Sequence, residues 1–342
     1  MTSAAGNATG RTLRFTASSA SSESLTALGR IGFGTIAVDS AREHILVSGP
    51  AANVVDILNY SGQLVGTIPD VYGAYGMVVH GRYLYVCEST AGAVVRINLN
   101  QSEPHPKTLA SGILEPRWLV MTKDLLWTTS GTKFGSNELV AVSPSGGDTS
   151  FPSPTFTSAD LAVANSSTNT LFVAEDGVSP GSLYRLDVSS GVPTLVTSSR
   201  IEGSNIQDLA VSPDGTRVVP ASGAPYHFVE FSAETLQPDG LIYPASSYPT
   251  AVAFSEPKPN LIATGIDAGG EGSPPDIWVD PVGVPAPILI ASAGVRRGHE
   301  VLPHGLAFSP DGTSLFAIFN VHSEAERLSE PGETLVSRLS VP

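Results

Sequence analysis

The stretch DLAVSPDGTRVV (Asp208–Val219) decides the fold expected for this chain. It reads as a short apolar strand, a tight turn and a second apolar strand. Pro213 sets one φ of the turn, and Asp214 with Gly215 supplies the positive φ that a tight hairpin needs. The stretch GLAFSPDGTSLFA (Gly305–Ala317) repeats this order of residue types. Two copies of a strand–turn–strand unit indicate an all-β repeat protein.

The same apolar strand recurs seven times along the chain, at successive spacings of 41, 42, 42, 48, 43 and 54 residues. The copies are Thr35–Val38, Gly76–Val79, Trp118–Met121, Asp160–Val163, Asp208–Val211, Ala251–Phe254 and Gly305–Phe308. This period is about the length of a four-stranded propeller blade. The repeat therefore predicts an all-β, seven-bladed β-propeller of four-stranded blades.

The two ends of the sequence suggest how such a ring closes. After the seventh copy only one strand, Thr334–Leu339, remains, and Arg11–Thr16 is a spare strand before the first copy. Pairing of this N-terminal strand with the C-terminal blade would leave only short, protected sheet edges. We expect residues 1–10 to be a disordered segment and residues 11–342 to form a single propeller domain.

Several stretches resemble a known family. The turn Val211–Thr216 and the strand pair Tyr85–Ile97 resemble the bacterial YVTN-type seven-bladed propellers, over roughly residues 26–341. Glu115–Trp118 followed by Leu126–Thr129 is similar to a YWTD-type or gluconolactonase-type blade. The resemblance implies a propeller fold. It implies no single function, because the YVTN group includes surface, periplasmic and enzymatic members.

Composition restricts the partners and the compartment. A formal net charge of −14 without a Lys/Arg block argues against binding to nucleic acid or to an anionic membrane. No apolar run approaches the roughly 18 residues that span a bilayer. A charged fraction of only 15% favours an extracellular or periplasmic protein, although no signal peptide is visible and a cytoplasmic location stays open. Closed propellers are often monomers, so we expect a monomer.

Repeat alignment predicts where a site would lie. In a propeller blade the first strand begins and the second strand ends on the same rim, so these positions surround the mouth of the central channel. Candidate ligand-binding residues at this channel mouth are Tyr75, Trp118, Asp160, Gln207, Thr250, Asn320 and His322. Acidic residues after second strands predict a Ca²⁺ or Mg²⁺ site, with Glu88, Glu175 and Asp176 as ligands.

Two functions from different classes follow from these candidates. The favoured one is a binding module that holds a small molecule, a glycan or a protein, because no nucleophile–base motif is present. The alternative is a lactonase-type or lyase-type enzyme. In that enzyme His304 or Asp208 would be the general base, and Arg117 would stabilise an oxyanion. Asp160 and Asp208 also have a structural alternative, which is to accept backbone N–H groups of neighbouring blades.

Overall fold

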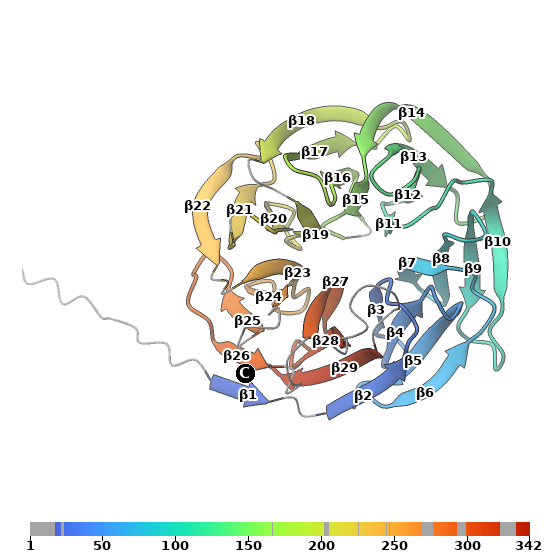
Figure 1. Ribbon diagram of the computed structural model, residues 1–342. Helices are drawn as coiled ribbons and strands as arrows, with labels where there is room; N and C mark the ends of the chain where they lie inside the picture. Colours follow the sequence, from blue (N-terminus) through green and yellow to red (C-terminus); the bar gives the residue numbers. More distant parts are fainter. Residues whose placement is uncertain are drawn as a thin grey trace, which may run out of the picture.

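The computed structural model describes residues 18–21, 24–165, 167–201, 205–224, 226–243, 245, 247–267, 276–292, 299–321 and 333–342. All the regular secondary structure within these ranges consists of β-strands. The sheets stand as a ring around a central axis (Figure 1). The all-β propeller fold expected from the repeat is therefore confirmed. No helix within these ranges is long and apolar enough to cross a membrane.

Five of the sheets have four antiparallel strands, hydrogen-bonded in chain order. The first contains β3 (Ile36–Asp39), β4 (His44–Gly49), β5 (Val54–Asn59) and β6 (Leu64–Ile68), and the second β7 (Ala74–His80), β8 (Tyr83–Glu88), β9 (Ala93–Asn98) and β10 (Pro106–Ser111). The third contains β11 (Leu119–Met121), β12 (Leu126–Ser130), β13 (Ser136–Val142) and β14 (Asp148–Thr157). The fourth and fifth contain β15 (Ala159–Ala162), β16 (Thr170–Glu175), β17 (Gly181–Asp187), β18 (Thr194–Ile201), β19 (Ile206–Val211), β20 (Arg217–Ser222), β21 (Phe228–Ser232) and β22 (Pro238–Tyr243).

The remaining strands form one nine-stranded sheet, so the prediction of seven four-stranded blades is wrong. This sheet contains β1 (Ser18–Ser21), β2 (Ser24–Gly29), β23 (Tyr248–Phe254), β24 (Leu261–Asp267), β25 (Ile277–Pro281), β26 (Leu289–Ser292), β27 (His299–Phe308), β28 (Ser314–Val321) and β29 (Glu333–Ser340). The structure thus has five separate four-stranded blades. The physical reason is a backbone pair between Asp267 and Glu300, which joins the extended end of β24 to the start of the ten-residue strand β27.

The strand that closes the ring lies later in the chain than expected. The predicted closing strand, residues 11–16, lies outside the described residues, as do residues 1–10. Instead β2 pairs antiparallel with β29, with Ser24 opposite Arg338. At the centre, β27 also contacts β3, so the innermost strands are continuous across this seam (Figure 1). The ring therefore joins its N-terminal and C-terminal parts through backbone hydrogen bonds.

The hydrophobic core lies between neighbouring sheets rather than in one place. In β4, Leu46 packs with Val86 of the next sheet, whereas Ile45 packs on the other face with Phe316 of the last. A strand buried on both faces needs apolar side chains in both orientations, which explains the continuous apolar runs of the second strands. Each fully buried aliphatic side chain of this kind contributes roughly 1.5–3 kcal/mol.

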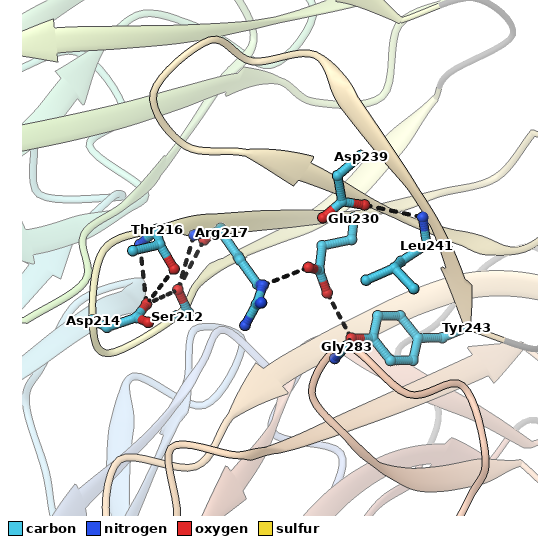
Figure 2. Close-up of polar contacts among 9 residues, drawn as sticks. All are labelled: Ser212, Asp214, Thr216, Arg217, Glu230, Asp239, Leu241, Tyr243 and Gly283. Atoms are coloured by element: carbon cyan, nitrogen blue, oxygen red, sulfur yellow. Dashed lines mark hydrogen bonds and ion pairs between the residues drawn. The ribbon is translucent and has the colours of Figure 1, made fainter. Parts of the chain in front are cut away.

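The turn of the deciding stretch has the predicted chemistry. Gly215 has a φ of 71°, and its N–H donates to the carbonyl oxygen of Ser212 at 2.8 Å. The Asp214 carboxylate accepts from the Ser212 hydroxyl at 2.6 Å and from the Thr216 N–H at 3.0 Å (Figure 2). Gly312, with a φ of 68°, occupies the same place in the second copy. Local hydrogen bonds thus hold both turns.

Side chains of third strands take part in polar contacts at two of the sheet boundaries. Arg96 of β9 donates to the carbonyl oxygen of Pro144 at 2.9 Å, across the boundary between the second and third sheets. In β21 an acid replaces the arginine. The buried Glu230 accepts from the Tyr243 hydroxyl at 2.6 Å, and the same hydroxyl accepts from the Gly283 N–H at 2.9 Å (Figure 2). Arg217 Nε lies 2.6 Å from Glu230 Oε1 and balances its charge.

Candidate ligand site at the channel mouth

Strand pairing places the start of each inner strand beside the end of the strand that follows it. Ala74 pairs with Glu88, and Ala159 pairs with Glu175. First positions of inner strands and the loops after second strands therefore share one rim, as the repeat alignment predicts. This rim, which carries Tyr75, Asp160 and His304, is the channel mouth.

His304 reaches across this rim from an irregular part of β27. The register of β27 against β28 shifts between Val301 and Leu306, and His304 has a φ of 56°. A Cβ at Gly305 would lie 2.6 Å from the carbonyl oxygen of Leu302, so this bulge needs glycine there. The sequence LPHG (Leu302–Gly305) therefore builds the bulge that carries the imidazole.

The imidazole of His304 lies between two carboxylates from different sheets. Its Nε2 is 3.1 Å from Oδ2 of Asp160 at the start of β15, and its Nδ1 is 3.0 Å from Oδ1 of Asp208 in β19. The Asp160 side chain is fully buried, and that of Asp208 is nearly so. One side chain thus connects three strands that are far apart in the sequence.

Asp208 is used mainly by backbone groups. Its Oδ2 accepts from the N–H groups of Val252 at 2.9 Å and His304 at 3.1 Å, and its Oδ1 accepts from Leu209 N–H at 2.7 Å. Val252 and His304 belong to two other inner strands, β23 and β27. Asp208 therefore has the structural arrangement that was the alternative to its catalytic assignment.

The two carboxylates beside His304 affect its pKa. Burial alone would lower the pKa of His304, but the carboxylates of Asp160 and Asp208 outweigh this and raise it well above 6.5. Burial also raises the pKa of Asp160, against the opposing charge of His304. The two carboxylates thus favour the protonated form of the imidazole, each of whose nitrogens faces a carboxylate oxygen.

Aromatic rings pack against the imidazole of His304. The ring centroids of Trp118 and His304 are 4.0 Å apart, and Tyr75 contacts Trp118 edge-on at 5.1 Å. An imidazolium beside an indole gains a cation–π attraction as well as contact area. Trp118 is only 8% exposed, and it also belongs to a buried hydrophobic cluster with Trp127 and Phe156.

A pocket of about 440 Å³ opens beside this cluster. Its polar lining residues are Tyr75, Ser89, Thr90, Glu115, Arg117 and Lys133. Arg117 Nη2 donates to Oε2 of Glu115 at 3.0 Å, while its Nη1 and Nε have no partner among the described residues. The ammonium group of Lys133 forms no ion pair within the described part of the chain, and lies 5.2 Å from the Phe134 ring. The pocket therefore presents unused cationic donors.

Asp176 adds an acid to the same region. Burial raises its pKa to about 7, and the Asp160 charge adds to this rise, while Lys133, His304 and Arg117 oppose it. Its carboxylate accepts no hydrogen bond from any described residue. Asp176 is thus an acid that changes charge near neutral pH, within electrostatic reach of the pocket cations.

The other predicted ligand-binding residues are engaged in local contacts. Gln207 donates to Asn205 at 3.2 Å, and the buried Thr250 hydroxyl donates to the Gly265 carbonyl oxygen at 3.3 Å. Asn320 lies in β28 opposite Thr334. His322 lies outside the described residues. The structure therefore brings Tyr75, Trp118, Asp160, Arg117 and His304 together, whereas Gln207 and Thr250 are held by local hydrogen bonds.

The predicted cation ligands do not converge. Glu88 accepts from the Tyr72 N–H at 3.0 Å and Glu175 from the Thr157 N–H at 3.2 Å. Within the described ranges, the one set of three or more possible ligands whose atoms lie within 4.8 Å of one another is Asp160, Asp208 and His304. Both imidazole nitrogens in that set already face carboxylates, so a divalent cation there would have to displace a proton. A Ca²⁺ or Mg²⁺ cofactor stays a prediction.

Lys133 is the functional candidate that sequence reasoning missed. It lies in the loop between β12 and β13, directly after a second strand. Loops after second strands surround the mouth, but none of the predicted candidates came from this loop. Applying the same rule here would have found the lysine.

The opposite rim has a different chemistry. A second cavity, of about 840 Å³, lies where the inner strands end. Apolar side chains from several sheets contribute to it, among them Val38, Val79, Met121, Phe254 and Phe308. The lining also includes the acids Asp39 and Glu256, so this cavity combines apolar side chains with polar and acidic groups, whereas the mouth pocket has Arg117 and Lys133 in its wall.

Comparison with known proteins identifies the fold but not the family. No protein-family model matches the sequence, and no curated protein matches it. Among solved structures the chain is similar to hydrazine synthase of Kuenenia stuttgartiensis, with a TM-score of 0.66 and 14% identity, over 92% of this chain and 97% of that one. Likeness at this identity shows the shared propeller fold alone, because one fold carries many functions.

Proposed function

We propose that this chain is a ligand-binding β-propeller that holds a small molecule in the pocket at the channel mouth. The observation that carries the proposal is the pocket itself, about 440 Å³ in volume, with unpaired donors of Arg117 and Lys133 in its wall. This volume lies in the range of small-molecule sites, and a few convergent polar groups are what such sites use for orientation. A folded protein partner would need a broader and flatter surface.

The state of the neighbouring cluster favours binding over turnover. The His304 imidazole lies between two carboxylates, and the oxygens of Asp208 accept from three backbone N–H groups. Hydrogen bonds and ion pairs of this kind make the side chains beside the pocket rigid. Because a preformed site loses little conformational entropy on binding, this rigidity supports affinity.

Trp118 provides a direct test of the proposal. Its ring contacts those of His304 and Tyr75 beside the pocket, whereas no ring contact among the described residues joins Trp127 or Trp278 to these two residues. A mixed library of sugars, alcohols, amines and acids would be titrated while tryptophan emission is followed. We expect at least one compound to give a saturable change that Arg117→Gln weakens and Trp118→Phe removes from the emission. Arg82→Gln, an exposed arginine in the turn between β7 and β8, is the control.

A second candidate function is a lactonase, favoured by one observation. The Asp176 carboxyl group, with a pKa of about 7, lies within electrostatic reach of Arg117. A carboxyl group with that pKa is partly ionised near neutral pH. Its carboxylate form can take a proton from an attacking water, while a guanidinium stabilises the oxyanion that forms. Hydrolysis of γ- and δ-lactones that Asp176→Asn abolishes would favour this enzyme. Binding of the same lactones without hydrolysis would favour the binding module.

A further inference from the structure

We infer that the mouth pocket recognises the carboxylate group of a small organic acid, held between Arg117 and Lys133. This inference rests on the proposed function, since it assigns a ligand class to the same pocket. Two cations share one small pocket of a chain whose net charge is −14. Such a concentration of positive charge in an acidic protein marks the place where an anion gains most.

The donors of the pocket match the two oxygens of a carboxylate. The Arg117 guanidinium is about one quarter exposed, and Nη1 and Nε have no partner among the described residues. A planar guanidinium can donate two parallel N–H bonds to a planar carboxylate. The Lys133 ammonium carries a second charge without an ion pair within the described ranges. The free donors thus fit a two-oxygen anion.

Hydroxyl groups complete the donor set. The hydroxyl groups of Tyr75 and Thr90 line the pocket and form no hydrogen bond with any described residue. Burial raises the pKa of Tyr75, so its phenol stays protonated and remains a donor. Hydrogen bonds from neutral groups to a charged acceptor are stronger than those between neutral groups.

Charge balance favours a singly charged ligand over phosphate. Glu115 neutralises one of the two cations, at 3.0 Å from Arg117. One net positive charge then remains in the pocket wall. The acid Asp176, which interacts electrostatically with Arg117 and Lys133 and with Asp160, lies near it. A monocarboxylate matches that single charge, whereas a doubly charged phosphate would bring an uncompensated charge close to these acids.

The test uses matched pairs of acid and amide on the full chain. Lactate with lactamide, benzoate with benzamide, and gluconate with gluconamide differ in the charged group and little else. Inorganic phosphate and sulfate are included as anions without a carboxylate. Binding is measured by calorimetry and by the shift of the melting temperature, because a ligand that binds the folded state raises it.

The inference predicts saturable binding of at least one carboxylate and no binding of its amide. Arg117→Gln is expected to weaken that binding about tenfold to a hundredfold, and Lys133→Gln to weaken it by a smaller factor. Arg117→Lys keeps the charge but loses the two parallel N–H donors of the guanidinium, so it should bind more tightly than Arg117→Gln but more weakly than the parent. Arg82→Gln, on the opposite side of β7 and β8, should bind like the parent. Lys133 is exposed, so its variant keeps the test valid if Arg117→Gln unfolds.

Each other outcome overturns a defined part. If amides bind as well as acids and Arg117→Gln still weakens them, the pocket is a ligand site but the carboxylate assignment is wrong. If phosphate or sulfate binds and no carboxylate does, the anion class is wrong. If no compound of the panel or of the mixed library binds, the proposed function fails together with the inference.

Discussion

The Nε2 atom of His304 lies 3.1 Å from Oδ2 of Asp160, a carboxylate without solvent exposure. Beyond this contact neither oxygen of Asp160 has a hydrogen-bond partner among the described residues. The histidine is therefore the main compensation for a buried charge in the middle of the ring, and it arrives from a strand 144 positions later in the chain.

Removing this histidine should destabilise the protein strongly. His304→Gln leaves Asp160 as an uncompensated buried carboxylate, which costs about 3–5 kcal/mol. The double variant His304→Gln with Asp160→Asn should cost less than the sum of the two single variants. Urea unfolding of the four proteins measures this coupling, with the exposed His105→Gln as control. Additive effects would contradict the pairing.

The contribution of His304 should depend on pH with a defined sign. Its pKa is raised in the folded state, so its stabilisation is fully present below about pH 6.5, the unfolded value, and is lost as the pH rises through the folded pKa. The difference in unfolding free energy between the parent and the double variant His304→Gln with Asp160→Asn, which has no uncompensated carboxylate at position 160, should therefore shrink from pH 6 to pH 9. A difference that grows with pH would show that the imidazole is neutral in the folded protein.

Asp280 should make the protein less stable as the pH rises. It is fully buried in β25, its oxygens accept no hydrogen bond within the described residues, and burial raises its pKa from 3.8 to about 7. The contribution of Asp280 to the free energy of unfolding is thus most favourable below pH 3.8. It falls by on the order of 4 kcal/mol as the pH rises to about 7. Asp280→Asn should be more stable than the parent at pH 8 and similar to it at pH 4. The exposed Asp148→Asn, followed by the same urea titration, should show neither change.

The Tyr243 hydroxyl should matter for stability and not for ligand binding. Tyr243→Phe leaves Glu230 Oε2 and the Gly283 N–H without their partner, at a cost of about 1–3 kcal/mol. The matched control is Tyr226→Phe, which removes a hydroxyl from a side chain that is 62% exposed. Chemical unfolding measures both variants. Equal stability of the two would mean that the buried network does not stabilise the boundary between its sheets.

Binding of a carboxylate ligand should weaken as Asp176 ionises. The charged groups in reach of Asp176 are Asp160, Lys133, His304 and Arg117, and its pKa is about 7. Above that pH the Asp176 carboxylate repels a second carboxylate in the pocket and competes for the cations. The dissociation constant should therefore rise between pH 6 and pH 8. Asp176→Asn should remove most of this rise. If the variant shows the same pH dependence of the dissociation constant as the parent, Asp176 does not affect ligand binding.

Much of the fold follows from local sequence patterns. The apolar strands, the Asp214-Gly215 turn and the rim on which a site would lie were predictable, because strand periodicity and turn chemistry depend on residues next to one another. The strand that pairs with β29 is β2 and not the predicted residues 11–16, which lie outside the described residues. This pairing joins positions about 310 residues apart, and local patterns carry no signal for it.

Repeat alignment also placed Tyr75, Arg117, Asp160 and His304 on one rim, since equivalent positions in each repeat face the same end. It did not reveal that His304 lies between two acids, or that Lys133 joins the pocket. These facts depend on the bulge in β27 and on the path of a loop, which have no periodic signal.

The sequence by itself determined that this chain is a β-propeller with a polar rim, because repeated local patterns leave few other folds. Only the tertiary structure decided the number of separate sheets, through the pairing of Asp267 with Glu300, and the position of His304 between Asp160 and Asp208. Both depend on residues that lie far apart in the sequence. These residues come together only when the ring closes.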